Sequence, residues 1–204
     1  MKELIDKYKS LYKRNDSNSS IDKLPISLGT DNDTYCRLAA LFELEVEKRG
    51  NIVLDDYTDK IEKVTRWLKN SPKRGLLLMG SVGNGKSTML HTIKYLIGYK
   101  ASLSDAIDIY DYFKQHGTMR LWNEYLVIID DLGAEPVRCT NYGEEHNPLA
   151  KLLLHRYDKQ LTTIIATNLN LQDIQDRYGD RVLDRMYEMF DVIIYKRESY
   201  RRPK

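Results

Sequence analysis

The chain contains an eight-residue segment whose composition suits the binding of phosphate groups. Residues 80–87 read Gly-Ser-Val-Gly-Asn-Gly-Lys-Ser and match the P-loop pattern of a glycine, four residues and Gly-Lys-Ser/Thr. Backbone N–H groups of a glycine-rich turn, together with the positive end of a following helix, can hold a triphosphate without water. The alternative interpretation is an ordinary glycine-rich turn that contains a lysine by chance.

The motif predicts a role for each of its residues. Lys86 is placed to reach the β- and γ-phosphates, and Ser87 is placed to bind Mg²⁺. The glycines permit positive φ angles and a close approach of the backbone to the phosphates. The residues that we expect to bind ATP are Gly80, Ser81, Val82, Gly83, Asn84, Gly85, Lys86, Ser87 and Thr88.

The segments on either side of the motif have the patterns that a P-loop requires. Residues 75–79 form a short apolar run that is typical of a buried parallel strand. After the motif, Leu90, Ile93 and Ile97 recur at helical spacing. Gly98 then marks the end of the helix. The motif therefore lies between a predicted strand and a predicted helix.

Two later apolar runs also end in polar residues. Residues 126–129 are followed directly by Asp130 and Asp131, and residues 162–166 are followed within two residues by Asn168. Catalytic residues of open α/β folds gather at the carboxyl ends of strands. We expect Asp130 to hold Mg²⁺, Asp131 to orient and polarise an attacking water, and Asn168 to contact the γ-phosphate or that water. The alternatives are an ordinary surface turn and a strand-end turn residue.

The chain of 204 residues is long enough for one α/β domain with its own core, and its composition is ordinary for a soluble globular protein. The net charge of +2 does not by itself indicate nucleic acid. No apolar run approaches roughly 18 residues and the start lacks a signal peptide, so we expect no membrane span and a cytoplasmic location. Cys36 and Cys139 fit no metal-binding spacing and are expected to be reduced structural thiols.

Hydrophobic periodicity predicts alternating strands and helices, and hence a mainly parallel sheet with helices on both faces. Residues 1–30 are interpreted as an N-terminal arm and polar linker, and residues 31–204 as the core with its preceding helices. The arm is either an interaction segment or packed on its own domain. Helices are expected at residues 1–14, 31–49 (capped by Asp31 or Asp33), 56–68, 87–97, 104–116, 148–159, 171–178 and 180–189. Strands are expected at residues 75–79, 100–103, 126–129, 162–166 and 191–195.

Together these motifs resemble the AAA+ ATPases, with Walker A at residues 80–87, Walker B at residues 126–131 and Asn168 as sensor 1. The chain is most similar to the branch of helicase loaders and transposase helpers of the DnaC and IstB type, over roughly residues 60–204. This resemblance rests on the order of further segments as well. They are residues 128–133, 156–158, 162–168, 180–186 and 198–201.

The resemblance implies a homo-oligomeric ATPase that uses ATP and Mg²⁺, with each site completed by an arginine from a neighbouring subunit. Arg185 is the first candidate for this arginine finger and Arg181 the second. The alternative is a pair of exposed helix arginines with acidic neighbours. The chain departs from the usual pattern in two ways. Walker B ends in Asp131 instead of glutamate, and the sequence leaves room only for a truncated or absent C-terminal lid.

The resemblance also implies binding of single-stranded DNA and of a replicative helicase, or of a transposase in the IstB-like alternative. Residues 196–204 hold five basic residues and one acid, which suits phosphate contacts but equally suits a solvated terminus. A small-molecule kinase would share the P-loop, but Asn168 favours water as the acceptor. A GTPase is disfavoured because no Asn-Lys-x-Asp segment occurs. A nucleotide-gated binding module with little hydrolysis stays open because of Asp131.

Overall fold

The computed structural model describes residues 1–16, 29–50, 57–141 and 143–196. The chain divides into two compact units, one of residues 1–72 and 88–100 and the other of residues 73–87 and 101–204. The described ranges leave out most of the expected polar linker and all of the basic end except Lys196. None of the helices in the described ranges is both long enough and apolar enough to cross a membrane.

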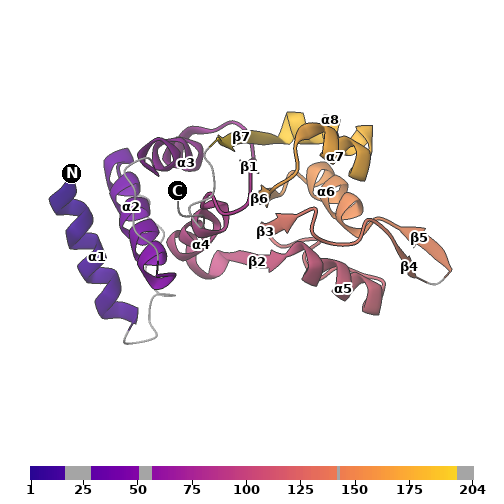
Figure 1. The fold of residues 1–204 in the computed structure, drawn as a ribbon, viewed down its shortest axis with the longest axis horizontal. Coiled ribbons are helices and arrows are strands. Elements are labelled where there is room, and N and C mark those ends of the chain that lie inside the picture. The colour runs from indigo at the N-terminus through magenta and orange to yellow at the C-terminus, as the bar shows by residue number, and fades with distance from the viewer. Residues whose placement is uncertain (17–28, 51–56, 142, 197–204) are drawn as a thin grey trace. The chain divides into compact units, whose positions relative to one another are not determined.

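The first unit consists of helices (Figure 1). They are α1 (Lys2–Asp16), α2 (Asp31–Lys48), α3 (Thr58–Asn70) and most of α4 (Lys86–Ile97), which a short 3₁₀ helix (Gly98–Lys100) follows. Helix α1 packs along α2, where the Lys9 ammonium donates to Glu43 at 2.8 Å and to Glu47 at 2.7 Å. Of the two alternatives for the N-terminal arm, the structure shows the packed one.

The predicted cap of α2 was wrong by one residue. Thr30, and not Asp31 or Asp33, is the N-cap. Its hydroxyl accepts from the Asp33 N–H at 3.2 Å, and the Asp33 carboxylate accepts from the Thr30 N–H at 3.1 Å. This reciprocal capping box satisfies two backbone donors that the first helical turn leaves without a partner. Thr30, Asp31 and Asp33 are all residue types that can cap a helix, so the sequence alone does not identify the N-cap; the backbone geometry does.

The second unit is built around a five-stranded parallel sheet of order β2-β3-β6-β1-β7. The strands are β1 (Gly75–Gly80), β2 (Ala101–Asp105), β3 (Leu126–Leu132), β6 (Thr162–Thr167) and β7 (Phe190–Tyr195). Helices of the same unit follow three of these strands. They are α5 (Ala106–His116), α6 (Pro148–Asp158), α7 (Leu171–Tyr178) and α8 (Asp180–Met189). The predicted α/β class with a parallel sheet flanked by helices is confirmed.

Strand β6 lies between β1 and β3. Leu78 pairs with Ala166 on one side of β6, and Ile129 pairs with Ile165 on the other. All three strands run parallel, so their carboxyl ends meet at one edge of the sheet. The residues that follow these strands are therefore brought together there.

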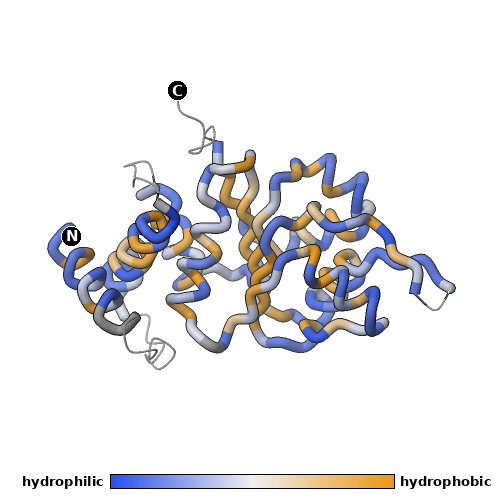
Figure 2. The backbone as a smooth tube through the Cα atoms, turned by 60° about the horizontal axis from the view of Figure 1, so that its bottom comes forward, coloured by the Kyte–Doolittle hydropathy of each residue, from blue (hydrophilic) through white to orange (hydrophobic). Residues whose placement is uncertain are grey.

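One face of the sheet forms a continuous hydrophobic core with α5 to α8. Leu77 and Met79 of β1, Val127 of β3 and Ile165 of β6 are buried in this core. The central strands of the sheet are mostly hydrophobic, as the orange colour in the middle of this unit shows in Figure 2. Burying each large apolar side chain contributes about 1.5–3 kcal/mol, so this core fixes the strand ends that carry the polar residues.

Two features of the second unit were not predicted. Strand β3 continues to Leu132 and so includes both aspartates. A small antiparallel hairpin of β4 (Cys139–Asn141) and β5 (Glu144–His146) also occurs between β3 and α6 (Figure 1). Both hairpin strands have three residues and carry mostly polar side chains, so no hydrophobic alternation marks them in the sequence.

A fully buried arginine fastens the loop before β3 to the start of β6. Arg156 of α6 donates to the Thr163 hydroxyl at 2.9 Å. It also donates to the carbonyls of Leu121, Glu124 and Thr162 at 3.0, 2.9 and 2.7 Å. Burial lowers the pKa of Arg156 to about 10, so the guanidinium stays charged at neutral pH.

We predict that Arg156→Leu lowers the free energy of unfolding by about 3 kcal/mol, because three carbonyls lose their buried donor. Urea unfolding followed by circular dichroism measures this loss. Thr163→Val is the matched control, since it removes a single partner of Arg156 and should cost about 1 kcal/mol. Equal stability of Arg156→Leu and the wild type would contradict the role of Arg156 in holding the loop before β3 against the start of β6.

Candidate functional site

The segment from Gly80 to Lys86 joins β1 to α4 through a turn that needs glycine. Gly80, Gly83 and Gly85 have φ angles of 147°, 83° and 92°. A Cβ atom on Gly80 would lie 2.4 Å from the carbonyl oxygen of Tyr195. The Asn84 side chain donates to this same carbonyl at 3.1 Å and so ties the turn to the end of β7.

The Lys86 ammonium is the centre of the site. It donates to the carbonyl oxygens of Gly80 at 2.7 Å and Ser81 at 2.8 Å. It also donates to the side-chain oxygens of Asn168 at 2.8 Å and Asn84 at 3.2 Å. Lys86 is only 5% exposed. Burial lowers its pKa to about 8, although the charges of Asp131 and Asp130 act in the opposite direction.

Ser87 follows this lysine in the sequence and contacts Asp130 at the carboxyl-terminal edge of the sheet. The Ser87 hydroxyl donates to the Asp130 carboxylate at 3.2 Å. Asp130 is buried, and the Asp131 N–H donates to its carboxylate at 2.9 Å. Burial raises the pKa of Asp130, the charges of Asp131 and Asp105 add to this effect, and the hydrogen bond from Ser87 opposes it.

These residues fit a magnesium ion. A hydroxyl and a carboxylate are oxygen ligands of the kind that Mg²⁺ accepts, together with substrate phosphates and water. Strand pairing places Asp105 opposite Asp130, so this edge of the sheet gathers three aspartates. A cation there would offset their mutual repulsion.

Asn168 links the lysine to the second aspartate. Its side-chain oxygen accepts from Lys86 at 2.8 Å, and its side-chain nitrogen donates to Asp131 at 3.4 Å. Asp131 is exposed and has a positive φ of 50°, which few residues other than glycine adopt. The five predicted residues Lys86, Ser87, Asp130, Asp131 and Asn168 thus lie in one connected group.

Four other predicted residues have different surroundings. Ser81 and Val82 are exposed in the turn. Thr88 is buried in α4, where its carbonyl accepts from Thr92 at 2.8 Å. Arg181 is exposed on α8.

Arg185 of α8 is held by its own neighbours. Its guanidinium pairs with Glu188 at 2.7 Å and Asp184 at 3.4 Å. It also lies over the ring of Tyr157, with 4.9 Å between the carbon of the guanidinium and the ring centroid. These contacts join Arg185 to α6 and α8 and not to the group around Lys86.

Three residues of the surrounding network were missed from the sequence. The buried Glu135 and Tyr178 and the half-buried Arg177 form a cluster next to the turn that follows Asp131. A glutamate four residues after Asp131 was the only local signal, and it gives no indication of burial. Asp105 was missed as well, because a single acid after a short strand is common.

Comparisons with known proteins identify the fold. No family model matches the sequence, and no curated protein matches it. A crystal structure of DnaI matches with 19% identity and a TM-score of 0.57 over 74% of this chain and 89% of that one. The AMPPCP-bound DnaA from Aquifex aeolicus matches with 22% identity and a TM-score of 0.54 over 72% of this chain and 49% of that one.

A structure of DnaA bound to AMPPCP and single-stranded DNA matches with 20% identity and a TM-score of 0.55, again over 49% of that chain and over 74% of this one. The chain has the AAA+ P-loop fold. At these identities the likeness concerns the fold, and this chain spans about half of each DnaA chain. The AAA+ fold places the P-loop, the end of β3 and the end of β6 at one sheet edge, as described above.

We predict that the affinity for ATP falls as the pH rises above about 8. The pKa of Lys86 is lowered to about 8, and only the protonated ammonium attracts phosphate oxygens. Below this pH the affinity should be nearly constant, and above it the apparent Kd should rise by up to about tenfold per pH unit. Titration with a fluorescent ATP analogue at constant ionic strength measures the profile.

The matched control is Lys86→Arg, because a guanidinium stays charged throughout this range. Its profile should be flat even if its overall affinity is lower. A decline of the same shape in Lys86→Arg would show that another group titrates.

Proposed function

We propose that this chain binds ATP with Mg²⁺ and hydrolyses it, and that it acts in DNA replication as a helicase loader. The observation that carries the proposal is the connected group of Lys86, Ser87, Asp130, Asp131 and Asn168 at one edge of the sheet. Cation, hydroxyl, carboxylates and amide are the groups that P-loop ATPases use. The AMPPCP in the DnaA structures, an analogue of ATP, supports the same ligand for this fold.

Each residue has a distinct task in this proposal. Lys86 would exchange its carbonyl partners for β- and γ-phosphate oxygens, and the N–H groups of the turn would add further donors. Ser87 and Asp130 would hold Mg²⁺, which supplies charge neutralisation when bound. Asp131 is exposed and would orient and polarise the attacking water, and Asn168 would contact that water or the γ-phosphate through its amide.

The hydrolysis step is proposed to need a second copy of the chain. Arg185 lies on α8 with its side chain partly exposed, and its partners Glu188 and Asp184 are surface acids. Such exposed pairs contribute little energy, so the guanidinium can leave them for a stronger partner. A γ-phosphate of the neighbouring subunit is such a partner, which makes Arg185 the proposed finger and Arg181 the second candidate.

The partners are proposed from the fold and from charge. DnaI and the DnaA bound to single-stranded DNA share this fold. The five basic residues among residues 196–204 suit contacts with the phosphates of single-stranded DNA. A replicative helicase is the proposed protein partner, and the cytoplasm the proposed location. A transposition helper of the IstB type is the second candidate, since the same branch contains both.

A nucleotide-gated binding module is favoured by one specific observation. Asp131 has one methylene fewer than the glutamate usual at its position, and it adopts a left-handed backbone conformation. Sizing the protein with and without ATP and single-stranded DNA, while recording phosphate release, separates the functions. A loader should assemble and release phosphate faster on DNA. A binding module should assemble with negligible release.

We predict that Lys86→Ala abolishes ATP binding, while Arg185→Ala preserves binding and lowers turnover at least about a hundredfold. Lys86 provides the charge that holds the phosphates, whereas Arg185 acts only on the charge that develops during hydrolysis. Equilibrium dialysis with labelled ATP measures binding, and phosphate release measures turnover.

Arg181→Ala is the matched control, since it removes an arginine one turn earlier on the same helix. Full turnover in Arg185→Ala would reject Arg185 as the finger. If Arg181→Ala were inactive while Arg185→Ala kept full turnover, Arg181 would replace Arg185 as the proposed finger. Mixing Arg185→Ala with Lys86→Ala subunits should restore part of the activity if the arginine acts across subunits.

A further inference from the structure

Glu135 is a charged residue in a position where burial is unusual. It lies four residues after Asp131 and is 2% exposed. Carboxylates are rarely buried unless hydrogen bonds or ion pairs compensate for the lost hydration. Its partners therefore show what this side chain holds together.

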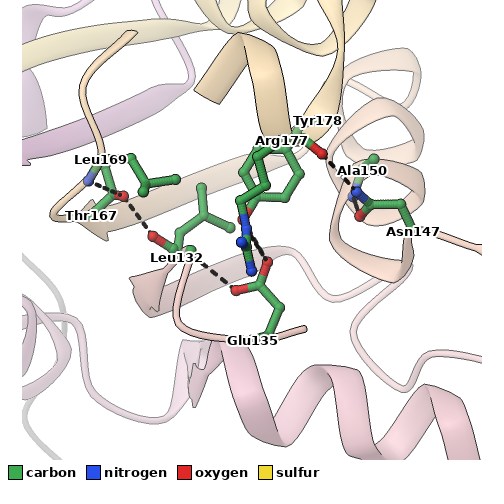
Figure 3. A network of polar contacts seen from close by, with 9 residues as sticks. Leu132, Glu135, Asn147, Ala150, Thr167, Leu169, Arg177 and Tyr178 are labelled. Atoms are coloured by element: carbon green, nitrogen blue, oxygen red, sulfur yellow. Dashed lines mark hydrogen bonds and ion pairs between the residues drawn. The ribbon is translucent and has the colours of Figure 1, made fainter. Parts of the chain in front are cut away.

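Glu135 binds the turn after β3 on one side and the end of α7 on the other (Figure 3). One carboxylate oxygen accepts from the Gly133 N–H at 2.9 Å. The other accepts from the Tyr178 hydroxyl at 2.5 Å and from Arg177 Nε at 3.4 Å. Burial and the Glu135 charge raise the pKa of Tyr178 far above its usual value, so its hydroxyl stays a donor.

The end of α7 is itself anchored to the rest of the unit. The Asn147 side chain donates to the carbonyl of Arg177 at 3.1 Å. Its oxygen accepts from the Ala150 N–H at 3.0 Å and caps α6 (Figure 3). The end of α7, which carries the partners of Glu135, is therefore itself hydrogen-bonded to the start of α6.

The turn whose Gly133 N–H donates to Glu135 also contains Asp131. The Ala134 N–H donates to the Asp131 carbonyl at 2.9 Å and closes the turn. The Thr167 hydroxyl donates to the Leu132 carbonyl at 2.6 Å from the neighbouring strand. Asp131 lies in the left-handed region, which aspartate adopts more readily than most non-glycine residues, and two contacts from outside the turn constrain it there. Thr167 and Glu135 supply these constraints from opposite sides of the turn.

We propose that Glu135 is a positioning residue for Asp131. By fastening the turn to the end of α7, it keeps the Asp131 carboxylate beside Asn168. The proposal rests on ATP hydrolysis as the function, because Asp131 is the residue proposed to orient the water. Within the described part of the chain, Glu135 is hydrogen-bonded to Gly133, Arg177 and Tyr178, and none of these is proposed to bind nucleotide. Hydrolysis should therefore depend on Glu135, and nucleotide binding should not.

The first measurement does not need hydrolysis. Amide hydrogen exchange of Gly133 and Ala134 is compared between the wild type, Glu135→Gln and Tyr178→Phe. Glutamine replaces one acceptor by a donor, which then faces either the Gly133 N–H or the donors on α7. We expect these two amides to exchange at least about tenfold faster in both variants. Thr163→Val removes a buried hydrogen bond at the far end of β6 and should leave both amides unchanged.

The second measurement separates binding from turnover. In Glu135→Gln, kcat should fall about ten- to a hundredfold, as expected when a catalytic group is misplaced. The Kd for AMPPCP should change by less than about twofold. The double variant with Tyr178→Phe should be no slower than Glu135→Gln, because the two side chains act as one unit. Thr163→Val should retain its kcat despite a lower melting temperature.

The outcomes distinguish this proposal from the proposed function. Full kcat in Glu135→Gln, in a protein that hydrolyses ATP, would overturn the role of Glu135 and leave the function intact. A wild type without turnover would overturn hydrolysis, and the Gly133 and Ala134 amides would then decide the role of Glu135. Unchanged exchange at these amides would overturn it in either case. A kcat that falls in Thr163→Val as far as in Glu135→Gln would reduce the effect to general stability and also overturn it.

Discussion

The pairing of β6 with β1 on one side and β3 on the other positions the whole candidate site. Parallel strands end at the same edge of a sheet, so Gly80, Asp130 and Asn168 lie at or near the carboxyl ends of neighbouring strands there. The distances of 2.8 and 3.4 Å from Asn168 to Lys86 and Asp131 result from this arrangement. The apolar side chains of these strands stabilise the pairing, and no site residue has to provide that energy.

Two buried charges are then held at this edge by different means. The Lys86 ammonium is surrounded by carbonyl and amide oxygens, but burial still dominates and lowers its pKa to about 8. The Glu135 carboxylate is compensated by an N–H group, a hydroxyl and a guanidinium. Its partners Arg177 and Tyr178 end α7, and Gly179 leads from there into α8, which carries Arg185. The turn at Asp131 and helix α8, which carries the proposed arginine finger, are thus both attached to the end of α7.

The sequence predicted the parts of the fold that local pattern encodes. The runs 75–79 and 126–129 and the Ile-Ile-Ala part of 162–166 are apolar, because central parallel strands are buried on both faces, and all three runs are strands in the structure. The P-loop glycines and the polar residues at the strand ends were found as well, because a short stretch of sequence is enough to show the motif and its position after an apolar run. Glu135 could not be found, since its burial depends on Tyr178, which lies 43 residues further along the chain. The hairpin β4–β5 has no hydrophobic period, and the choice of Thr30 as cap depends on backbone angles.

The central claim is that one pocket of peptide N–H groups, Lys86, Ser87 and Asp130 holds a nucleoside triphosphate with its metal. The most direct measurement is a titration of the ¹⁵N-labelled chain with AMPPCP, with and without Mg²⁺, followed by amide spectra. The account predicts saturable shifts that include Gly83, Gly85 and Ser87 and that need Mg²⁺ for tight binding. Spectra that stay unchanged in this segment at millimolar nucleotide would contradict it.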